Sequence, residues 1–150
     1  MNQIVYREGY KYQLAETYRV ATFIEVGTAI KTDYIRLAPN GVLTVKEGYA
    51  WDGPSGPTKV LAAAMPEWLK KKFLKSFMCG SLVHDALYQL MRERLLDHDT
   101  YRKRADRTLQ RICLEDGMSK LRAWWVYQGV RLGGGPAADP NNENPVLRAP

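Results

Sequence analysis

The sequence predicts an α+β domain, in which a small N-terminal antiparallel β-sheet is followed by about four helices and an irregular C-terminal tail. Two observations predict this order. Apolar residues alternate with polar ones through the first fifty residues, and they recur at helical spacing from Pro66 onward. Strands that precede helices are typical of the α+β class. Because 150 residues are about one domain's worth, we assign residues 1–135 to a single domain and 136–150 to the tail.

The strands are predicted from period-two patterns. Large apolar residues share one parity over Tyr10–Ile24, which predicts one long strand that is bent or bulged because of its length. The segments Tyr34–Leu37 and Val42–Val45 flank Asn40-Gly41, a pair that readily adopts the positive φ angles of a tight turn. We therefore expect an antiparallel hairpin there.

The helices are predicted from apolar residues at 3.6-residue spacing. A first helix begins at Pro66, and we expect the chain to break or tighten at Gly80-Ser81 before a second helix. A third helix follows a turn and cap at Asp97 and ends at Asp116-Gly117. A fourth spans roughly residues 119–132 and stops at three consecutive glycines. The tail beyond them is rich in Pro and Asn and shows no periodicity.

The composition is that of an average soluble globular protein, with 45% apolar and 25% charged residues. Charged residues interrupt every apolar run well before the twenty or so residues that a transmembrane helix needs, and the start lacks the apolar stretch of a secretory signal. Two cysteines outside any Cys-x-x-Cys pair exclude a disulfide framework and a structural zinc site. A reducing cytoplasm is the simplest compartment for such a chain.

The net charge is +6, and a basic excess attracts nucleic acid or anionic membranes. This charge also lies within the usual range that keeps a small domain soluble, so composition alone does not favour nucleic acid as a partner. The densest basic run is Arg102-Lys103-Arg104 with Arg107 and Arg111. It is the best candidate in the sequence for binding a phosphate or another anion.

Two polar residues occupy apolar helical stripes. His84 shares a stripe with Leu87 and Tyr88, and Asp106 lies among Ala, Leu, Ile and Cys residues on the next helix. A buried carboxylate is costly without a partner, and consecutive helices usually pack antiparallel, so we expect His84 and Asp106 to be in contact. The pair is either a general-base dyad or a structural latch, and Arg102 is a competing partner for Asp106.

Asp85 follows His84 and therefore points about 100° away around the helix. The segment Gly48–Pro57 is rich in Gly and Pro and predicts a structured loop, with Trp51, Gly53, Ser55 and Gly56 as its candidate site residues. If this loop packs beside Asp85, then Asp52, Asp85, backbone carbonyls and water form an oxygen-rich site that suits Ca²⁺. The alternative is that Asp85 is an ordinary exposed residue early in a helix. The loop lacks the spacing of a phosphate-binding loop or of a serine nucleophile elbow.

Three motifs in order resemble domain-of-unknown-function family 1353: the segment Gly48–Pro57, then Leu82-Val83-His84-Asp85-Ala86-Leu87-Tyr88, then Arg104-Ala105-Asp106. The resemblance covers roughly residues 30–132. It implies an origin in a bacteriophage or prophage, hence a location in the host cytoplasm or the virion. It implies no established activity.

A second resemblance is chemical. Phospholipases of the A2 type carry a similar His-Asp-x-x-Tyr segment, an Asp on the next helix and a Gly-rich calcium loop upstream. The resemblance implies that His84 is the base with Tyr88 beside it, Asp85 a calcium ligand, and Asp106 the carboxylate that orients the histidine. The sheet that precedes the helices and the missing disulfide framework depart from that family.

Two classes of function follow. In the first, the chain is a small hydrolase in which a cation polarises an ester carbonyl and His84 activates water. In the second, it works by binding, as a virion or phage-tail component or as a partner of phage or host proteins.

In the C-terminal segment 136–150, large apolar side chains occur only in Val146-Leu147-Arg148. We therefore expect this segment to dock on a neighbouring subunit or on its own domain.

Overall fold

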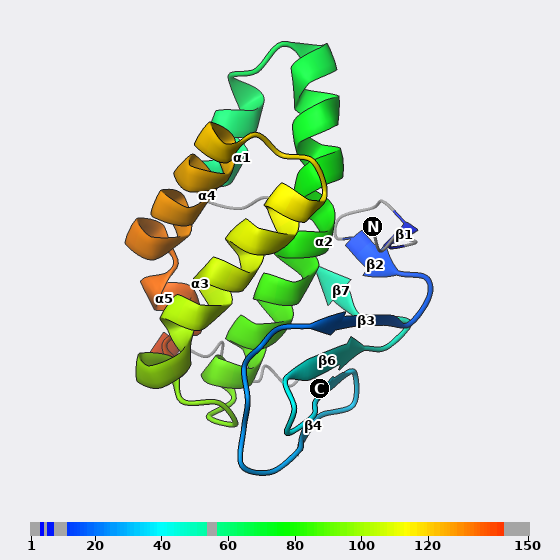
Figure 1. Ribbon diagram of the computed structural model, residues 1–150, viewed down its shortest axis with the longest axis vertical. Helices are drawn as coiled ribbons and strands as arrows, with labels where there is room; N and C mark the ends of the chain where they lie inside the picture. The colour runs from blue at the N-terminus through cyan, green and yellow to red at the C-terminus, as the bar shows by residue number, and fades with distance from the viewer. Residues whose placement is uncertain (1–3, 5, 8–11, 54–56, 143–150) are drawn as a thin grey trace, which may run out of the picture.

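The computed structural model describes residues 4, 6–7, 12–53 and 57–142 (Figure 1). The strands are β1 (Tyr6–Arg7), β2 (Tyr12–Leu14), β3 (Tyr18–Ala21), β4 (Ile30–Lys31), β5 (Ile35–Leu37), β6 (Val42–Val45) and β7 (Ala50–Trp51). The helices are α1 (Pro57–Ala63), α2 (Glu67–Arg92), α3 (His98–Glu115), α4 (Lys120–Gly133) and α5 (Gly135–Ala138), followed by the 3-10 turn η1 (Pro140–Asn142). Antiparallel strands precede the helices, which confirms the predicted α+β class.

Within the described residues the strands form two small sheets, with the orders β1-β2-β7 and β3-β6-β5-β4. The prediction of one long strand over residues 10–24 is therefore wrong. Its described part divides after Leu14, because β2 pairs with β1 and β7 whereas β3 pairs with β6. The alternation of buried and exposed residues continues through β3 as far as Ile24. The period was correct, but it does not reveal the change of pairing partner.

The predicted hairpin is confirmed, since β5 pairs with β6 around Asn40-Gly41 and Gly41 has a φ of 79°. The predicted loop starts later than expected. Trp51 pairs with Tyr12 as the last residue of β7, so it belongs to a strand. Helix α1, which begins at Pro57, was not predicted. Proline suits a first helical position, but a seven-residue helix has too few turns to show a period.

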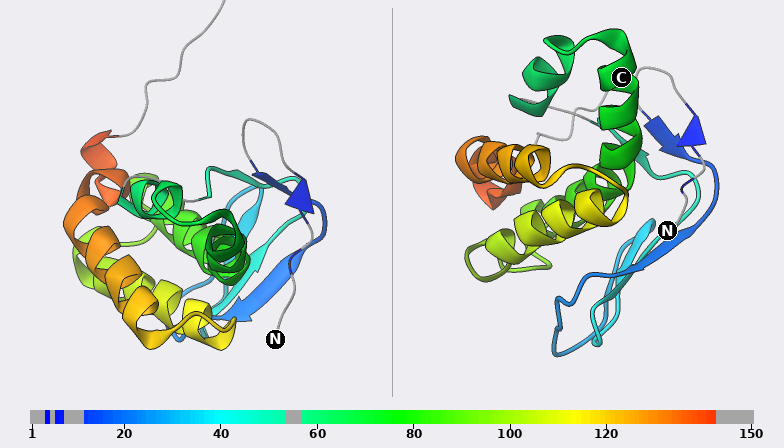
Figure 2. Two further views of the ribbon diagram at one scale, coloured as in Figure 1. Left: turned by 90° about the horizontal axis from the view of Figure 1, so that it is seen from above. Right: turned by 45° about the horizontal axis from the view of Figure 1, so that its top comes forward.

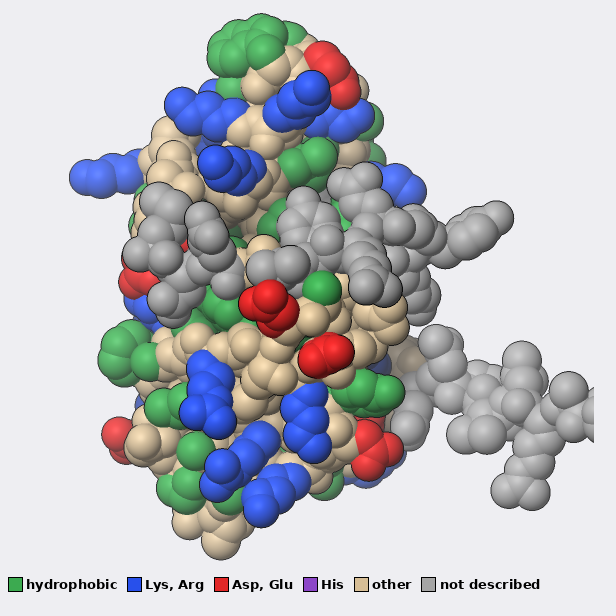
Figure 3. All heavy atoms as spheres, turned by 90° about the vertical axis from the view of Figure 1, so that its right-hand side faces the viewer, with side chains coloured by type: hydrophobic (Ala, Val, Ile, Leu, Met, Phe, Trp, Pro, Cys, Tyr) green, Lys and Arg blue, Asp and Glu red, His purple; other side chains and the backbone are tan. Residues whose placement is uncertain are grey.

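Helix α2 lies between the sheets and the other helices (Figures 1 and 2). Two apolar clusters meet along it. The larger cluster joins the sheets to the C-terminal half of α2, through residues such as Leu43, Val45 and Leu82. The smaller joins the N-terminal half of α2 to α1, α3 and α4 through Phe73, Leu109, Val126 and their neighbours. The outer face of the four-stranded sheet is left to solvent (Figure 3).

The predicted break at Gly80-Ser81 is wrong, because α2 runs through it as one helix of 26 residues. A Cβ atom at Gly80 would lie 2.8 Å from Leu109 Cδ1 and 3.0 Å from Cys113 Sγ, both on α3. The glycine is therefore needed for the close approach of two helices and not for a change of chain direction.

Replacing Gly80 with alanine is expected to lower the free energy of unfolding by about 1–3 kcal/mol, because the added methyl group collides with α3. The effect opposes helix propensity, which favours alanine over glycine by about 1 kcal/mol. Urea denaturation measures it. Gly27→Ala is the matched control, since nothing lies within 4 Å of a Cβ at Gly27. A Gly80→Ala variant as stable as the wild type would show that the interface between α2 and α3 relaxes freely.

The described part of the tail packs on the domain. Ala138 in α5 is fully buried, and Arg92 Nη1 at the end of α2 donates a hydrogen bond of 2.8 Å to the carbonyl oxygen of Ala137. Residues 143–150, including the predicted docking segment Val146-Leu147-Arg148, lie outside the described residues. Within the described part of the chain, every helix is too short or too polar to cross a bilayer.

Candidate functional site

His84 and Asp106 are in contact, as the sequence predicts. Antiparallel packing of α2 on α3 brings His84 Nε2 within 2.8 Å of Asp106 Oδ1. His84 is 7% exposed and Asp106 is completely buried. Since Asp106 accepts the Nε2 hydrogen, the second ring nitrogen of His84 is left to face elsewhere.

Asp106 has two further partners. The Tyr88 hydroxyl donates to Asp106 Oδ1 at 2.7 Å, and Arg131 Nη1 donates to Oδ2 at 2.8 Å. Tyr88 also lies against the His84 ring, with 3.9 Å between the ring centroids. Arg131 comes from the last turn of α4 and was not predicted. The carboxylate thus joins α2, α3 and α4 through charged and neutral hydrogen bonds.

This network sets the charges of its members. Burial alone would raise the pKa of Asp106, but hydrogen bonds from His84, Tyr88 and Arg131 outweigh burial and hold the pKa below its usual range. Burial alone would lower the pKa of His84, but the hydrogen bond to Asp106 and the nearby charge of Asp85 outweigh burial, so this pKa is raised. The site therefore favours an ionised Asp106 beside a His84 that holds its proton more firmly than a free imidazole.

Arg102 is not the partner of Asp106 that the sequence allowed. Its Nε donates to the Tyr88 hydroxyl at 3.2 Å, and its Nη2 donates to the carbonyl oxygens of Val130 and Arg131 at 3.0 and 2.7 Å. It thus caps the end of α4, where carbonyl oxygens lack helical partners. Arg104 and Arg107, the other predicted anion-binding residues, are exposed on α3. The basic run is therefore divided between an internal contact and the surface.

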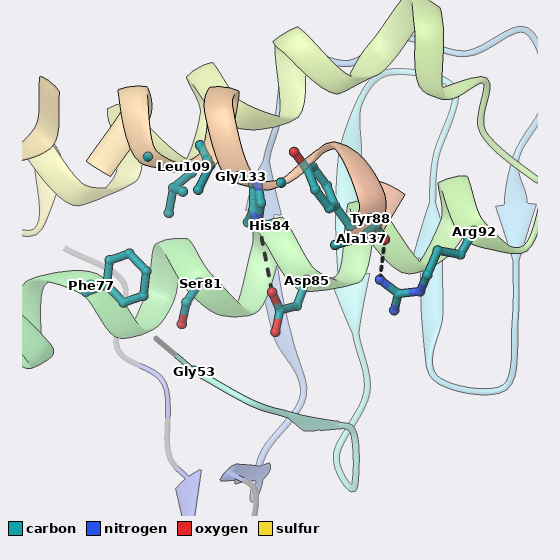
Figure 4. Close-up of a pocket in the computed structure, with 13 residues that line it drawn as sticks. Gly53, Phe77, Ser81, His84, Asp85, Tyr88, Arg92, Leu109, Gly133 and Ala137 are labelled. Atoms are coloured by element: carbon teal, nitrogen blue, oxygen red, sulfur yellow. Dashed lines mark hydrogen bonds and ion pairs between the residues drawn. The ribbon is translucent and has the colours of Figure 1, made fainter. Parts of the chain in front are cut away.

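A pocket of about 200 Å³ opens on the other edge of His84 (Figure 4). It lies among α2, α3, α4 and α5. Its lining residues are Gly53, Phe77, Ser81, His84, Asp85, Tyr88, Arg92, Leu109, Gly129, Val130, Gly133, Gly134 and Ala137. His84 Nδ1 is 4.0 Å from Asp85 Oδ1, and the Asp85 side chain is 30% exposed.

The loop predicted to lie near Asp85 does so over its described part. Trp51 is buried, and its indole N–H donates to Ser81 Oγ at 3.2 Å, one turn before Asp85. Gly53 is buried, has a φ of 67° and lines the pocket. A Cβ atom at Gly53 would collide with the Tyr12 ring, which explains the glycine. Ser55 and Gly56 lie outside the described residues.

The two predicted calcium ligands differ in burial. Asp52 is exposed and Asp85 is half-buried. After burial, which is the main cause, both carboxylates contribute to raising the pKa of Tyr49. Within the described ranges, Asp97, His98 and Asp99 are close enough to share one metal ion. Neither Asp52 nor Asp85 belongs to a group of three or more His, Cys, Asp or Glu side chains of this kind among the described residues. Because Ca²⁺ takes six to eight oxygen ligands, most of its shell would have to come from loop carbonyls and water.

Comparison with known proteins places the chain in a family. No curated protein and no solved structure matches it. Residues 28–130 match the family described as "Protein of unknown function (DUF1353)". This span includes His84, Asp106 and the candidate loop, and Arg131 follows directly after it. Because the match covers well over half of the sequence, the chain belongs to the DUF1353 family.

Proposed function

We propose that the chain is a small hydrolase that cleaves a carboxylic ester, with His84 as the general base. One observation carries this proposal: Asp106 clamps the imidazole through Nε2, while the Nδ1 edge faces a pocket that also holds Asp85. A histidine oriented by a buried carboxylate, with its free nitrogen in a pocket, has the arrangement that general-base catalysis requires.

The proposed reaction uses one water molecule and one proton-carrying group. The lone pair on His84 Nδ1 takes a proton from water while the water oxygen attacks the ester carbonyl carbon. The tetrahedral intermediate then collapses, and the leaving alkoxide takes the proton back from Nδ1. Between these two steps His84 is an imidazolium, and its positive charge is stabilised by Asp106 and by Asp85. The atoms balance as ester plus water giving acid plus alcohol.

The pocket limits the size of the substrate. Its volume of about 200 Å³ is smaller than the roughly 300–1,000 Å³ of sites for drug-sized ligands. Phe77, Leu109 and Val130 contribute apolar groups to its lining, and three glycines at the α4 end present no side chains to it. Short acyl chains are therefore the substrates that fit best.

A screen of chromogenic esters with acyl chains of two to about eight carbons tests the proposal. We expect the wild type to hydrolyse the shorter esters and the His84→Gln variant to lose this activity. Arg104→Gln is a matched surface control, since Arg104 is exposed on α3 and the pocket does not include it. Absence of hydrolysis by the wild type across the whole series would contradict the proposal.

The rate of hydrolysis is expected to rise with pH through an apparent pKa above 6.5, because only neutral His84 accepts a proton and both neighbouring carboxylates favour its charged form. The same shift stabilises the fold below pH 6.5, and this contribution is lost as the pH rises through the folded-state pKa. Asp85→Asn removes one carboxylate and is expected to move the apparent pKa downward. A pH–rate profile measures it, with Asp99→Asn as the charge-matched control. An unchanged profile in Asp85→Asn would show that Asp85 does not act on His84.

Calcium binding through Asp52 and Asp85 is part of this proposal and is tested separately. When bound, Ca²⁺ would polarise an ester carbonyl. We expect titration with millimolar Ca²⁺ to release or absorb heat in a calorimeter, and Asp85→Asn to abolish that signal. No heat from the wild type would remove the cation and leave His84 as a base that acts without a metal.

A second candidate function is a binding protein without chemistry, such as a virion or tail component. The observation that favours it is the saturation of Asp106, which accepts hydrogen bonds from His84, Tyr88 and Arg131 and so latches helices together. In both cases we propose a phage or prophage protein of the host cytoplasm or virion, on the resemblance of the three sequence motifs. The proposed partners are then phage or host proteins, or further copies joined through the tail.

A further inference from the structure

We propose that the outer face of the four-stranded sheet binds single-stranded nucleic acid. We call this surface the basic sheet face and define it by Arg19, Phe23, Lys31, Tyr34, Arg36, Thr44 and Lys46. Figure 3 looks onto the side of the molecule that carries it, where Lys and Arg side chains gather on the lower half of the view. The surface includes none of the residues that line the His84 pocket.

Strand register places three of the cations in one row. Lys31 lies opposite Arg36 between β4 and β5. Thr44 of β6 lies opposite Arg36 on one side and opposite Arg19 of β3 on the other. The neighbours of Arg19, Arg36 and Thr44 along their strands are buried, and Lys31 is itself exposed, so the row points outward. With about 4.8 Å between neighbouring strands, it spans about 14 Å.

This row is unfavourable in the isolated chain. Like charges directly opposite each other on neighbouring strands are destabilising, and Lys31 and Arg36 form such a pair. Across the described ranges, no acidic side chain forms an ion pair with Lys31, Arg36 or Arg19. Exposed Asp33 and Glu47 lie next in sequence to Tyr34 and Lys46, at the end of these strands. A bound polyanion would relieve the repulsion within the row.

An exposed aromatic ring lies two residues beyond the end of β3, beside the basic sheet face. Phe23 continues the exposed positions 19 and 21, and its side chain is 70% exposed. The Arg111 guanidinium lies 4.9 Å from the centre of its ring, held by hydrogen bonds to Ala21 O and Glu115. Phe23 also has a φ of 59°, an unusual backbone conformation for a bulky residue. The chain thus supports a strained, exposed ring without gaining burial from it.

The combination of a cationic row and an exposed aromatic ring fits single-stranded nucleic acid better than other polyanions. Exposed cations that track phosphates, beside an aromatic ring on which a base stacks, are the pattern of single-strand binding. A duplex is read by an element that enters a groove, whereas this face is a broad sheet. An anionic membrane favours exposed tryptophan and leucine, and the exposed Trp68, Trp124 and Trp125 lie on helices and not on this face.

Fluorescence anisotropy with labelled single-stranded DNA and RNA 12-mers tests the proposal over about 50–200 mM NaCl. Three phosphate contacts predict a slope of about −2 in a plot of log affinity against log salt. The variant Arg19→Gln/Lys31→Gln/Arg36→Gln is expected to lose measurable binding. Phe23→Ala is expected to weaken binding about tenfold with an unchanged salt slope. A His84→Gln variant should bind as the wild type does, which separates this test from that of the hydrolase.

The charge-matched control is Lys71→Gln/Lys72→Gln/Lys75→Gln, whose residues are exposed on α2. It should retain binding, and thermal melts should show all variants folded. Equal losses in both triple variants would show that net charge alone is read and would overturn the proposal. So would the absence of binding by the wild type at 50 mM NaCl, or binding to vesicles of phosphatidylserine and phosphatidylcholine without binding to either oligonucleotide.

Discussion

Replacing Asp106 with alanine is expected to lower the free energy of unfolding by about 3–5 kcal/mol. Asp106 is completely buried, and its removal leaves His84, Tyr88 and Arg131 without the carboxylate to which they donate. Because the whole stability of a domain is about 5–15 kcal/mol, this loss is a large part of it. Urea denaturation at constant pH measures the change, read from the midpoint and slope of the transition.

Two further variants show where the loss comes from. Asp106→Asn keeps the size of the side chain but loses its charge, so it should destabilise the fold by a smaller amount. Asp99→Ala, at an exposed aspartate on the same helix, is expected to stay within about 0.5 kcal/mol of the wild type. A loss below about 1 kcal/mol for Asp106→Ala would contradict the view that this carboxylate holds the helices together.

Replacing His84 with glutamine is expected to lower the rate of ester hydrolysis by about 10²–10⁴-fold, the usual contribution of a general base. The fold should lose only about 1 kcal/mol, because Asp106 keeps its hydrogen bonds to Tyr88 and Arg131. Initial rates and urea denaturation on the same preparation give both quantities.

The latch predicts the opposite pattern. If the pair is only structural, the wild type shows no hydrolysis, and the loss of stability in His84→Gln is then the only effect of the substitution. A His84→Gln variant that is both fully active and fully stable would contradict the hydrolase and the latch together.

The contact between His84 and Asp106 could be predicted because both residues interrupt apolar stripes on consecutive helices. Burial makes a partner necessary, and antiparallel packing supplies one. Arg131 could not be predicted in this way. It lies 25 positions after Asp106 on a helix whose orientation the sequence does not define, and the nearer Arg102 offers a local alternative. The cost of burying the charge of Asp106 shows that it has a partner. It does not show which of several arginines that partner is.

The fold shows a similar division. Local chemistry predicted the Asn40-Gly41 hairpin and the cap at Asp97, whose carboxylate accepts the Thr100 amide hydrogen at 2.8 Å. The interpretation of Gly80 failed because glycine serves helix breaks and close helix packing equally well. Only the position of α3 distinguishes these two uses. The prediction of one long strand over residues 10–24 failed for the same reason, since pairing partners are a property of the whole sheet.

The two apolar clusters have a consequence for motion. The His84 pocket lies at their boundary, with Tyr88 in the larger cluster and Phe77 and Leu109 in the smaller. Cooperative units of a fold separate most easily where little apolar surface is shared and where polar contacts exchange with water. The end of α4 is fastened across this boundary by Arg131 and by the Arg102 cap. The end of α4 is therefore the part of the pocket wall that a local opening would move first, while the sheets and the larger cluster stay folded.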